Sequence, residues 1–450
     1  MLTALAFVLF CLVCSIFAFT RHPIWGLYFY MATTYVFPPD RWWHALLPDL
    51  RWAFSSAAIT TLAVIFHRGK LKPKPAWIAS TPAAVFVLYA VWMLVQTPWA
   101  LDLEEHHKAT EVLIKCLLAC WFVYRIVDTK ERVHDLLFAH VLGCAFLGVL
   151  AVITGRQDGR LDGVGGPNLN DSNTLGMYLG TAAIVGVVLV LIQKGWRRWV
   201  SLGCLLFIVQ GFVLANSRGS FLGFAAGAAV LAFCKTKEHR RAFWAFALVG
   251  ALGLVTLVDH VFIDRMFTIG DVTSDSEEAD TSARSRLVII KAQAQMFLDY
   301  PMGSGRHGTA VLSPRYMDER WLTVDADGIA ERGSHNTFMT TLAEQGLPGA
   351  LLFSVLLGWI FVSPFRVRNM GRTTADSELT MMGAALSGAL MVVVVAGTTA
   401  DYLYKEVQFW LYPALVTVFW LARSNAQALR PNRPLSGQPA LAPALPAAKR

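Results

Sequence analysis

The sequence predicts an all-α fold, a polytopic membrane helical bundle with one long external loop that contains amphipathic helices. Of the 450 residues, 55% are hydrophobic and only 16% are charged, and the mean hydropathy is +0.48. A helix needs roughly 20 apolar residues to cross the hydrocarbon layer of a bilayer, and runs close to this length recur along nearly the whole chain. This composition is typical of a membrane protein and argues against a soluble protein of two or three domains.

Each apolar run indicates one helix, because a backbone in hydrocarbon must satisfy its own hydrogen bonds. Several runs are short, so we expect about 12 spans. The candidate spans are residues 1–19, 23–37, 52–66, 76–96, 109–127, 136–153, 174–193, 199–214, 220–234, 242–258, 348–362, 379–400 and 407–421. The first run lacks a basic leader and a cleavage site, so we expect an uncleaved anchor.

Basic residues lie in clusters between the apolar runs and predict the orientation of the bundle. By the positive-inside rule these clusters face the cytoplasm. They lie in residues 68–74, 125–132, 194–198, 235–241 and 366–372. Alternation of the spans then places loops 97–107, 155–171 and 260–334 outside. The net charge of +8 therefore comes from the loops that set the orientation of the spans. Because the sequence has no basic face interleaved with aromatic residues, we expect no nucleic-acid partner.

This orientation divides the chain into four parts. We expect N-terminal transmembrane helices in 1–259, a long external loop in 260–335, C-terminal transmembrane helices in 336–423 and a disordered cytoplasmic tail in 424–450. The external loop is far longer than the connections that usually join packed helices, which indicates function or disorder.

Part of the external loop has the spacing of a helix. Leu287, Ile290, Ala294 and Phe297 recur on one helical face, and Pro301 follows. We expect an amphipathic helix over residues 284–300, started by one of the nearby serines, that lies on the outer membrane surface or caps the bundle.

The most informative segment consists of His335-Asn336, nine further residues, and then Gly346-Leu347-Pro348-Gly349. We expect a helix of about three turns from His335 to Gln345, ended by Gly346, with Pro348 in the first turn of the next helix. His335 then begins a short helix that breaks just above a span. Such a break is tolerated at membrane depth where it lines a cavity or is covered by protein.

Three basic groups on the external side are candidates for chemistry. Arg218 lies in a short turn between two apolar runs, where it either faces a polar cavity or is an ordinary interfacial arginine. Arg286 either contacts an anion at the start of the loop helix or is solvated. His335 either handles a proton, which an imidazole does near neutral pH, or is an interfacial residue. The neighbouring Asn336, the helix break and the two arginines favour chemistry.

These motifs resemble those of the O-antigen ligase and O-antigen polymerase superfamily, which includes O-linked protein glycosylation ligases. The resemblance depends on the His335-Asn336 motif, the preceding loop with Arg286, and the turn around Arg218; the outer segment with Asn168 is similar to the Pro-Asn segment of that superfamily. It implies a GT-C-like, multi-pass protein of the bacterial inner (cytoplasmic) membrane. The active site would face the periplasm, so residues 260–335 would form a periplasmic loop.

The resemblance also implies a glycosyltransferase that moves a glycan from undecaprenyl pyrophosphate to an acceptor hydroxyl, with inversion and without a metal or other cofactor. A lipid pyrophosphate is a good leaving group, so one base suffices where glycoside hydrolysis usually takes two carboxylates. We assign His335 as the catalytic base. Arg218 and Arg286 are assigned to catalysis and to pyrophosphate binding, and Asn336 and Asn168 to substrate binding.

The acceptor stays open at this point. The general layout favours an O-antigen ligase of lipopolysaccharide biosynthesis with the lipid A core as acceptor; an O-antigen or exopolysaccharide polymerase and a protein O-glycosylation ligase are the alternatives. A lipid-linked sugar transporter or flippase is the alternative of another class, but transporters usually show inverted repeats, and the sequence shows none. We interpret Asp325-Ala326-Asp327 and the acidic residues 271–280 as solvated loops, and Cys11-x-x-Cys14 as packing residues. Asp401 is either interfacial or in a cavity.

Overall fold

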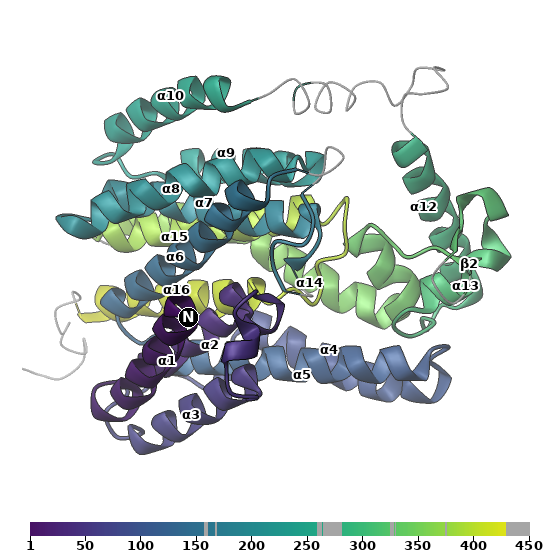
Figure 1. Ribbon diagram of the computed structural model, residues 1–450, viewed down its shortest axis with the longest axis horizontal. Helices are drawn as coiled ribbons and strands as arrows, with labels where there is room; N and C mark the ends of the chain where they lie inside the picture. Colours follow the sequence, from purple (N-terminus) through teal and green to yellow (C-terminus); the bar gives the residue numbers. More distant parts are fainter. Residues whose placement is uncertain are drawn as a thin grey trace, which may run out of the picture.

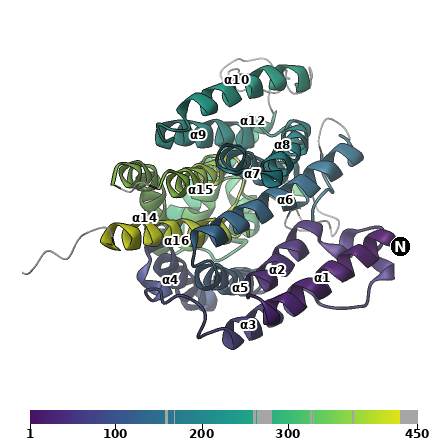
Figure 2. The same cartoon turned by 90° about the vertical axis from the view of Figure 1, so that its left-hand side faces the viewer.

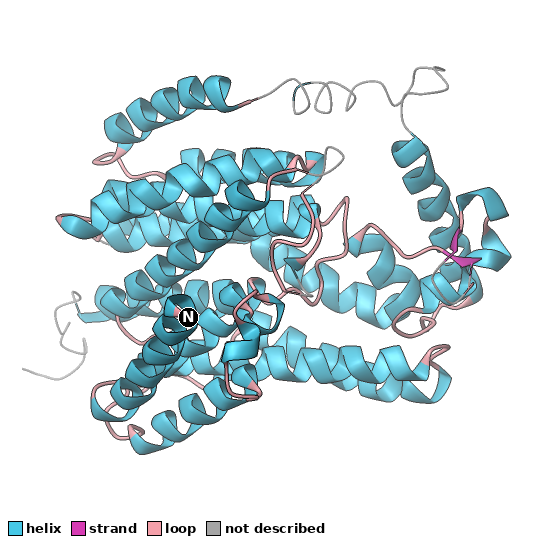
Figure 3. Cartoon of the chain, viewed as in Figure 1, coloured by secondary structure: helices cyan, strands magenta, loops and turns pink. Residues whose placement is uncertain are grey.

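The computed structural model has the all-α polytopic architecture that the sequence predicts. It describes residues 1–156, 161–166, 169–258, 263, 281–324, 328, 330–373 and 376–428. Most helices run along the long axis of one bundle, and α12 and α13 gather at one end of it (Figure 1). Figure 3 shows one small strand pair within these residues, β1 (Thr323–Val324) antiparallel to β2 (Ala330–Glu331).

The helices of the first part of the chain are α1 (Leu2–Thr20), α2 (Ile24–Val36), α3 (Trp52–Phe66), α4 (Thr81–Gln96), α5 (Leu103–Ile126), α6 (Lys130–Thr154), α7 (Ser172–Ile192), α8 (Trp196–Ala215), α9 (Arg218–Cys234) and α10 (Arg240–Leu257). The later helices are α12 (Thr281–Asp299), α13 (Gly308–Tyr316), α14 (Thr337–Thr373), α15 (Ser377–Ala396) and α16 (Gln408–Ala428). Nearly all of α7 and α15 is buried, so these two helices form the centre of the core. α10 lies at the edge of the bundle in both views (Figures 1 and 2).

Seven of the described helices are long and apolar enough to cross a membrane. They are Leu2–Thr20, Thr81–Trp99, Lys130–Thr154, Ser172–Ile192, Trp196–Ala215, Thr337–Thr373 and Ser377–Ala396. The expected count of about 12 spans is therefore not supported. α2, α3 and α9 have only 13, 15 and 17 residues, which at the helical rise gives about 20–26 Å, and the first half of α5 contains several charged residues.

The connecting segments form two groups, one at each end of the bundle, and the contacts within each group identify its members. The basic clusters meet at one end, here named the basic end, through four polar pairs: Lys72 with Asp128, Lys130 with Asp376, Arg197 with Asp135, and Ser377 with Glu238. The opposite end, here named the site end, joins the loops that the sequence places outside: Leu101 with Ser304, Asp102 with His307, Arg41 with Val164, and Asn336 with Thr398. This grouping is the one that the positive-inside rule predicts; the compartment that each end faces stays a prediction.

The predicted loop helix exists as α12, and the face that packs into the bundle lies beside the expected apolar stripe. The residues of α12 that pack into the core are Ile289, Ala292 and Met296, which join Leu312 and Ala343 in a small hydrophobic cluster. The expected stripe lies beside this face; Leu287 is 48% exposed and Ala294 is also exposed. α12 packs against α13 and α14 and so caps the site end, while its remaining apolar residues stay on the surface.

The predicted helix break is present in α14, at Gly346. This residue has φ 64° and ψ −165°, a backbone conformation that is essentially restricted to glycine. A side chain there would also overlap the backbone of Met302 and Gly303, because the loop after α12 packs directly against the break. The start of the helix is corrected: α14 begins at Thr337, and His335 precedes it in a loop.

Gly346→Ala should destabilise the site end. We expect a loss on the order of 1–3 kcal/mol from backbone strain, with further loss because the loop at Met302 must move away. Thermal unfolding in detergent measures the change. Gly358→Ala is the matched control, because Gly358 lies in the same helix and an added Cβ meets no atom within 4 Å; equal melting temperatures for both variants would contradict this account.

Candidate functional site

His335 is an exposed residue held between two anchored neighbours. On one side, Ser334 Oγ accepts a hydrogen bond from Gln293 Nε2 of α12 (2.8 Å) and one from Thr340 Oγ1 of α14 (2.6 Å). On the other side, Asn336 is fixed to two elements. The backbone at His335 is therefore anchored on both sides, and its exposed side chain lies at the surface of the site end.

Asn336 has a structural role that the sequence did not predict. Its Oδ1 accepts hydrogen bonds from the backbone N–H groups of Phe338 (2.9 Å) and Met339 (3.1 Å), so Asn336 is the N-cap of α14. Its Nδ2 donates to the carbonyl of Thr398 (3.0 Å) in the loop between α15 and α16. With both ends of its amide used, Asn336 positions His335; its predicted contact with substrate stays a prediction.

Arg218 is the first residue of α9, at the site end. Ser217 caps this helix, and its hydroxyl donates to Asn173 Oδ1 of α7 (2.9 Å), while Ser220 Oγ donates to the Asn173 carbonyl (2.9 Å). The amino termini of α7 and α9 therefore lie side by side. Because helix amino termini favour anions, a half-buried arginine at this point strengthens the positive potential of the site end.

Arg286 lies in the second turn of α12 and is half-buried. Its charge acts on Tyr402, a buried tyrosine between α15 and α16: burial raises the pKa of Tyr402 most, Asp171 also raises this pKa, and Arg286 lowers it. Arg286 is therefore close enough to the loop before α16 to share its electrostatic environment.

The helices that begin at or beside Arg218 and His335 contact one segment, residues 397–402, here named the central loop, and the charge of Arg286 acts on Tyr402 in the same segment. On one side, Gly219 packs so tightly against Thr399 that a Cβ on the glycine would overlap the threonine hydroxyl. On another, Thr337 N donates to the Gly397 carbonyl (2.8 Å), and Thr337 Oγ1 donates to the Ala400 carbonyl (2.8 Å). Arg218 and His335 thus adjoin residues that contact the central loop.

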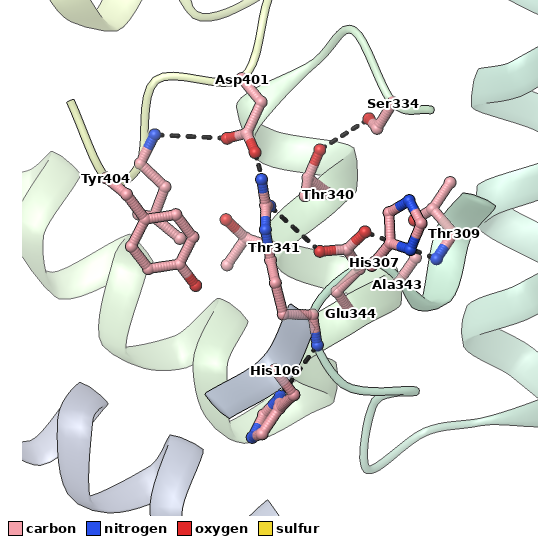
Figure 4. Close-up of polar contacts among 12 residues, drawn as sticks. His106, His307, Thr309, Ser334, Thr340, Thr341, Ala343, Glu344, Asp401 and Tyr404 are labelled. Atoms are coloured by element: carbon pink, nitrogen blue, oxygen red, sulfur yellow. Dashed lines mark hydrogen bonds and ion pairs between the residues drawn. The ribbon is translucent and has the colours of Figure 1, made fainter. Parts of the chain in front are cut away.

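A largely buried ion triad includes Asp401 of the central loop (Figure 4). Arg306, in the loop after α12, pairs with Glu344 Oε2 of α14 (3.1 Å) and with Asp401 Oδ2 of the central loop (2.6 Å). Their side chains are 28%, 5% and 13% exposed, respectively. The guanidinium also lies 5.0 Å from the centre of the Tyr404 ring. The triad connects the loop after α12, the broken helix α14 and the central loop.

The guanidinium of Arg306 keeps its charge in this surrounding. Burial lowers the pKa of Arg306, but the carboxylates of Asp401 and Glu344 outweigh this effect and hold the pKa above its ordinary value. The backbone around it is also fixed, because Arg306 N donates to His106 Nδ1 of α5 (3.0 Å) and the Glu344 carbonyl accepts from Gln96 Nε2 (2.7 Å). These bonds and the triad together hold the loop after α12 against α5 and α14, and hold α14 against α4.

Several predicted residues and segments cannot be placed, and other groups were missed. Asn168, the acidic pair Asp325 and Asp327, the acidic residues 271–280 and residues 429–450 of the tail lie outside the described residues. Within the described parts of the chain, no group of three or more His, Cys, Asp or Glu side chains is arranged to hold a metal ion. The triad was not predicted, although one signal was available: Glu344 is an ionisable residue in a helix that enters an apolar segment, where such residues mark functional sites.

Comparison with known families identifies the segment that contains these groups. Residues 203–354 match the family model described as O-antigen ligase, which confirms the resemblance to the O-antigen ligase superfamily. The matched range contains Arg218, Arg286, His335 and Glu344 but not the central loop. A comparison with curated proteins found no match.

Proposed function

We propose that this membrane protein, which contains an O-antigen ligase domain in residues 203–354, transfers a glycan from undecaprenyl pyrophosphate to an acceptor hydroxyl at the periplasmic face of the bacterial inner membrane. The match supports a ligase or polymerase type of activity. The donor, the acceptor and the mechanism are the proposal, with a lipid A core as the favoured acceptor.

The proposed reaction is a single displacement. The acceptor oxygen attacks the anomeric carbon of the glycan and forms the new glycosidic bond, while the bond from that carbon to the pyrophosphate oxygen breaks. The acceptor proton passes to His335, and the lipid pyrophosphate leaves with the electron pair of the broken bond. Arg218 and Arg286 stabilise the developing negative charge, since planar guanidinium groups pair bidentately with phosphate oxygens. Direct displacement inverts the anomeric configuration.

One observation supports the proposal most: the helices that begin at or beside Arg218 and His335 both contact the central loop at the site end, and the charge of Arg286 acts on Tyr402 of the same loop. In the chain these residues are far apart, so this arrangement comes from the fold. A base and two guanidinium groups are the set that such a displacement needs. The test is product formation from a synthetic lipid-linked glycan by the purified, reconstituted protein; no product with any lipid-linked donor and acceptor would refute the proposal.

Arg286→Lys should reduce transfer on the order of 10²-fold in kcat/KM, because an ammonium keeps the charge but loses the paired hydrogen bonds to phosphate. Arg218→Lys should have a similar effect. Steady-state kinetics with varied donor measure both. Arg284→Lys is the matched control, since Arg284 is an exposed residue on the same helix. Unchanged kinetics for Arg286→Lys, or an equal loss for Arg284→Lys, would rule out phosphate pairing by Arg286.

A further inference from the structure

A large groove lies away from α9 and α12, between α2, α3 and α5. Its volume is about 1000 Å³, and it is lined by these helices together with loop residues at the site end. Ligand sites in proteins commonly have volumes up to this size. In both views α3 lies on the opposite side of the bundle from α9 (Figures 1 and 2). Nothing in the proposed reaction uses this groove.

The walls of the groove fit a lipid chain. Ala57 and Ala58 of α3 face it on one side, and Leu118 and Phe122 of α5 on the other. Small side chains on α3 leave the space open, and few polar groups interrupt it. From Glu111 to Phe122, α5 provides a wall of about 16 Å at the helical rise, which is long enough for an extended lipid chain.

Charged groups concentrate at one end of the groove. Arg51 precedes the first turn of α3, and Glu111 and Lys115 form an exposed ion pair (2.5 Å) near the middle of α5, in the part of the groove nearer the site end. The deeper wall is apolar. The groove therefore has the polarity of an amphiphile whose head lies at the site end and whose tail points toward the basic end.

The charged end of the groove continues to the candidate site. Glu406 lines the groove and directly follows Lys405, which interacts electrostatically with Asp401 and Arg306 of the triad. Leu169, also in the lining, lies two residues before the Asp171 cap of α7. A molecule with its tail in the groove would thus place its head beside the central loop.

We propose that this groove binds the acyl chains of a membrane-anchored glycolipid acceptor. The inference rests on the proposed function and specifies the acceptor class. The donor pyrophosphate is assigned to Arg218 and Arg286 on the side of α9 and α12, so the second substrate approaches from the other side. The charged lining residues are two cations, Arg51 and Lys115, and two carboxylates, Glu111 and Glu406. A balanced set does not favour a pyrophosphate, whereas carboxylates accept hydrogen bonds from sugar hydroxyls.

The test compares two acceptors in nanodiscs: a synthetic diacyl glycolipid with an oligosaccharide head, and the same oligosaccharide without acyl chains. Ala58→Trp fills the groove. We expect KM for the glycolipid to rise at least tenfold, with KM for the prenyl-pyrophosphate donor and the rate with the free oligosaccharide unchanged. Leu62→Trp is the control, because Leu62 lies on the same helix, is exposed and does not line the groove.

Two kinetic results would overturn the proposal. An increase in donor KM for Ala58→Trp would show that the groove holds the prenyl chain instead, and an unchanged glycolipid KM would show that it holds only bulk lipid. Native mass spectrometry of glycolipid binding provides a readout that does not need transfer. If the wild type forms no product, the proposed function fails by itself; weaker glycolipid binding by Ala58→Trp than by Leu62→Trp would still support the groove, and equal binding would refute it.

Discussion

His335→Ala should reduce glycan transfer by about 10²–10⁴-fold, the range that a positioned general base contributes. The imidazole is exposed, and its neighbours Ser334 and Asn336 keep their own anchors. The substitution therefore removes the base without disturbing the loop that presents it. The decrease should appear in kcat with donor binding preserved, since Arg218 and Arg286 remain. Product formation in proteoliposomes measures the rate.

The appropriate control for this variant is His107→Ala. His107 is an exposed histidine at the site end, in the first turns of α5, and it has no assigned role. Its loss should leave transfer unchanged. The thermal unfolding curve of His335→Ala should also match that of the wild type. Near-normal transfer by His335→Ala would remove the base from the mechanism, and an equal loss of activity and stability would indicate a structural role instead.

Arg306→Met should be the most destabilising single change at the site end. It leaves the carboxylates of Glu344 and Asp401 buried without their cation, and breaking a buried ion pair by removing one partner costs roughly 3–5 kcal/mol. Both carboxylate side chains are well below one third exposed, so solvent compensates little. Transfer should fall as well, because the triad joins α14 to the central loop that the candidate site surrounds. Chemical or thermal unfolding in detergent measures the first effect.

A double substitution tests whether the loss comes from the uncompensated charges. Adding Asp401→Asn to Arg306→Met removes one of the two stranded carboxylates, so the combined loss should be smaller than the sum of the single losses. Arg315→Met serves as the control, since Arg315 is an exposed arginine of the adjacent helix α13. Additive losses, or a comparable effect of Arg315→Met, would contradict the pairing seen in Figure 4.

Local features of the fold were predictable because they depend on nearby residues. The break at Gly346 follows from a glycine before Pro348, and α12 follows from a regular apolar spacing. Which face of a helix is buried depends on elements that are distant in the sequence. α12 buries Ile289 and Met296 rather than the neighbouring stripe with Leu287, because α13 and α14 meet it on that side. The span count is unsupported for a different, local reason: apolar runs such as those of α2 and α3 form helices that are shorter than a bilayer requires.

In the candidate site, too, some features depend on nearby residues and others on tertiary contacts. His335, Arg218 and Arg286 were selected by residue type, flanking residues and the resemblance; the helices beside His335 and Arg218 contact the central loop, and the charge of Arg286 acts on Tyr402 within it. Glu344 carried a signal by itself, but its pairing could not be predicted, because Arg306 lies 95 residues from Asp401 and 38 from Glu344. Only the folded bundle brings them together. Asn336 illustrates a further limit, since an amide beside a histidine suits substrate binding and helix capping equally well.

The central claim is that one imidazole and two guanidinium groups act together on a lipid pyrophosphate at the site end. A structure of the protein with a non-reactive lipid-pyrophosphate glycan bound tests it most directly. The account predicts phosphate oxygens at about 3 Å from the guanidinium nitrogens of Arg218 and Arg286, with the His335 imidazole on the opposite face of the anomeric carbon. A pyrophosphate bound away from these side chains, or at the basic end, would contradict it.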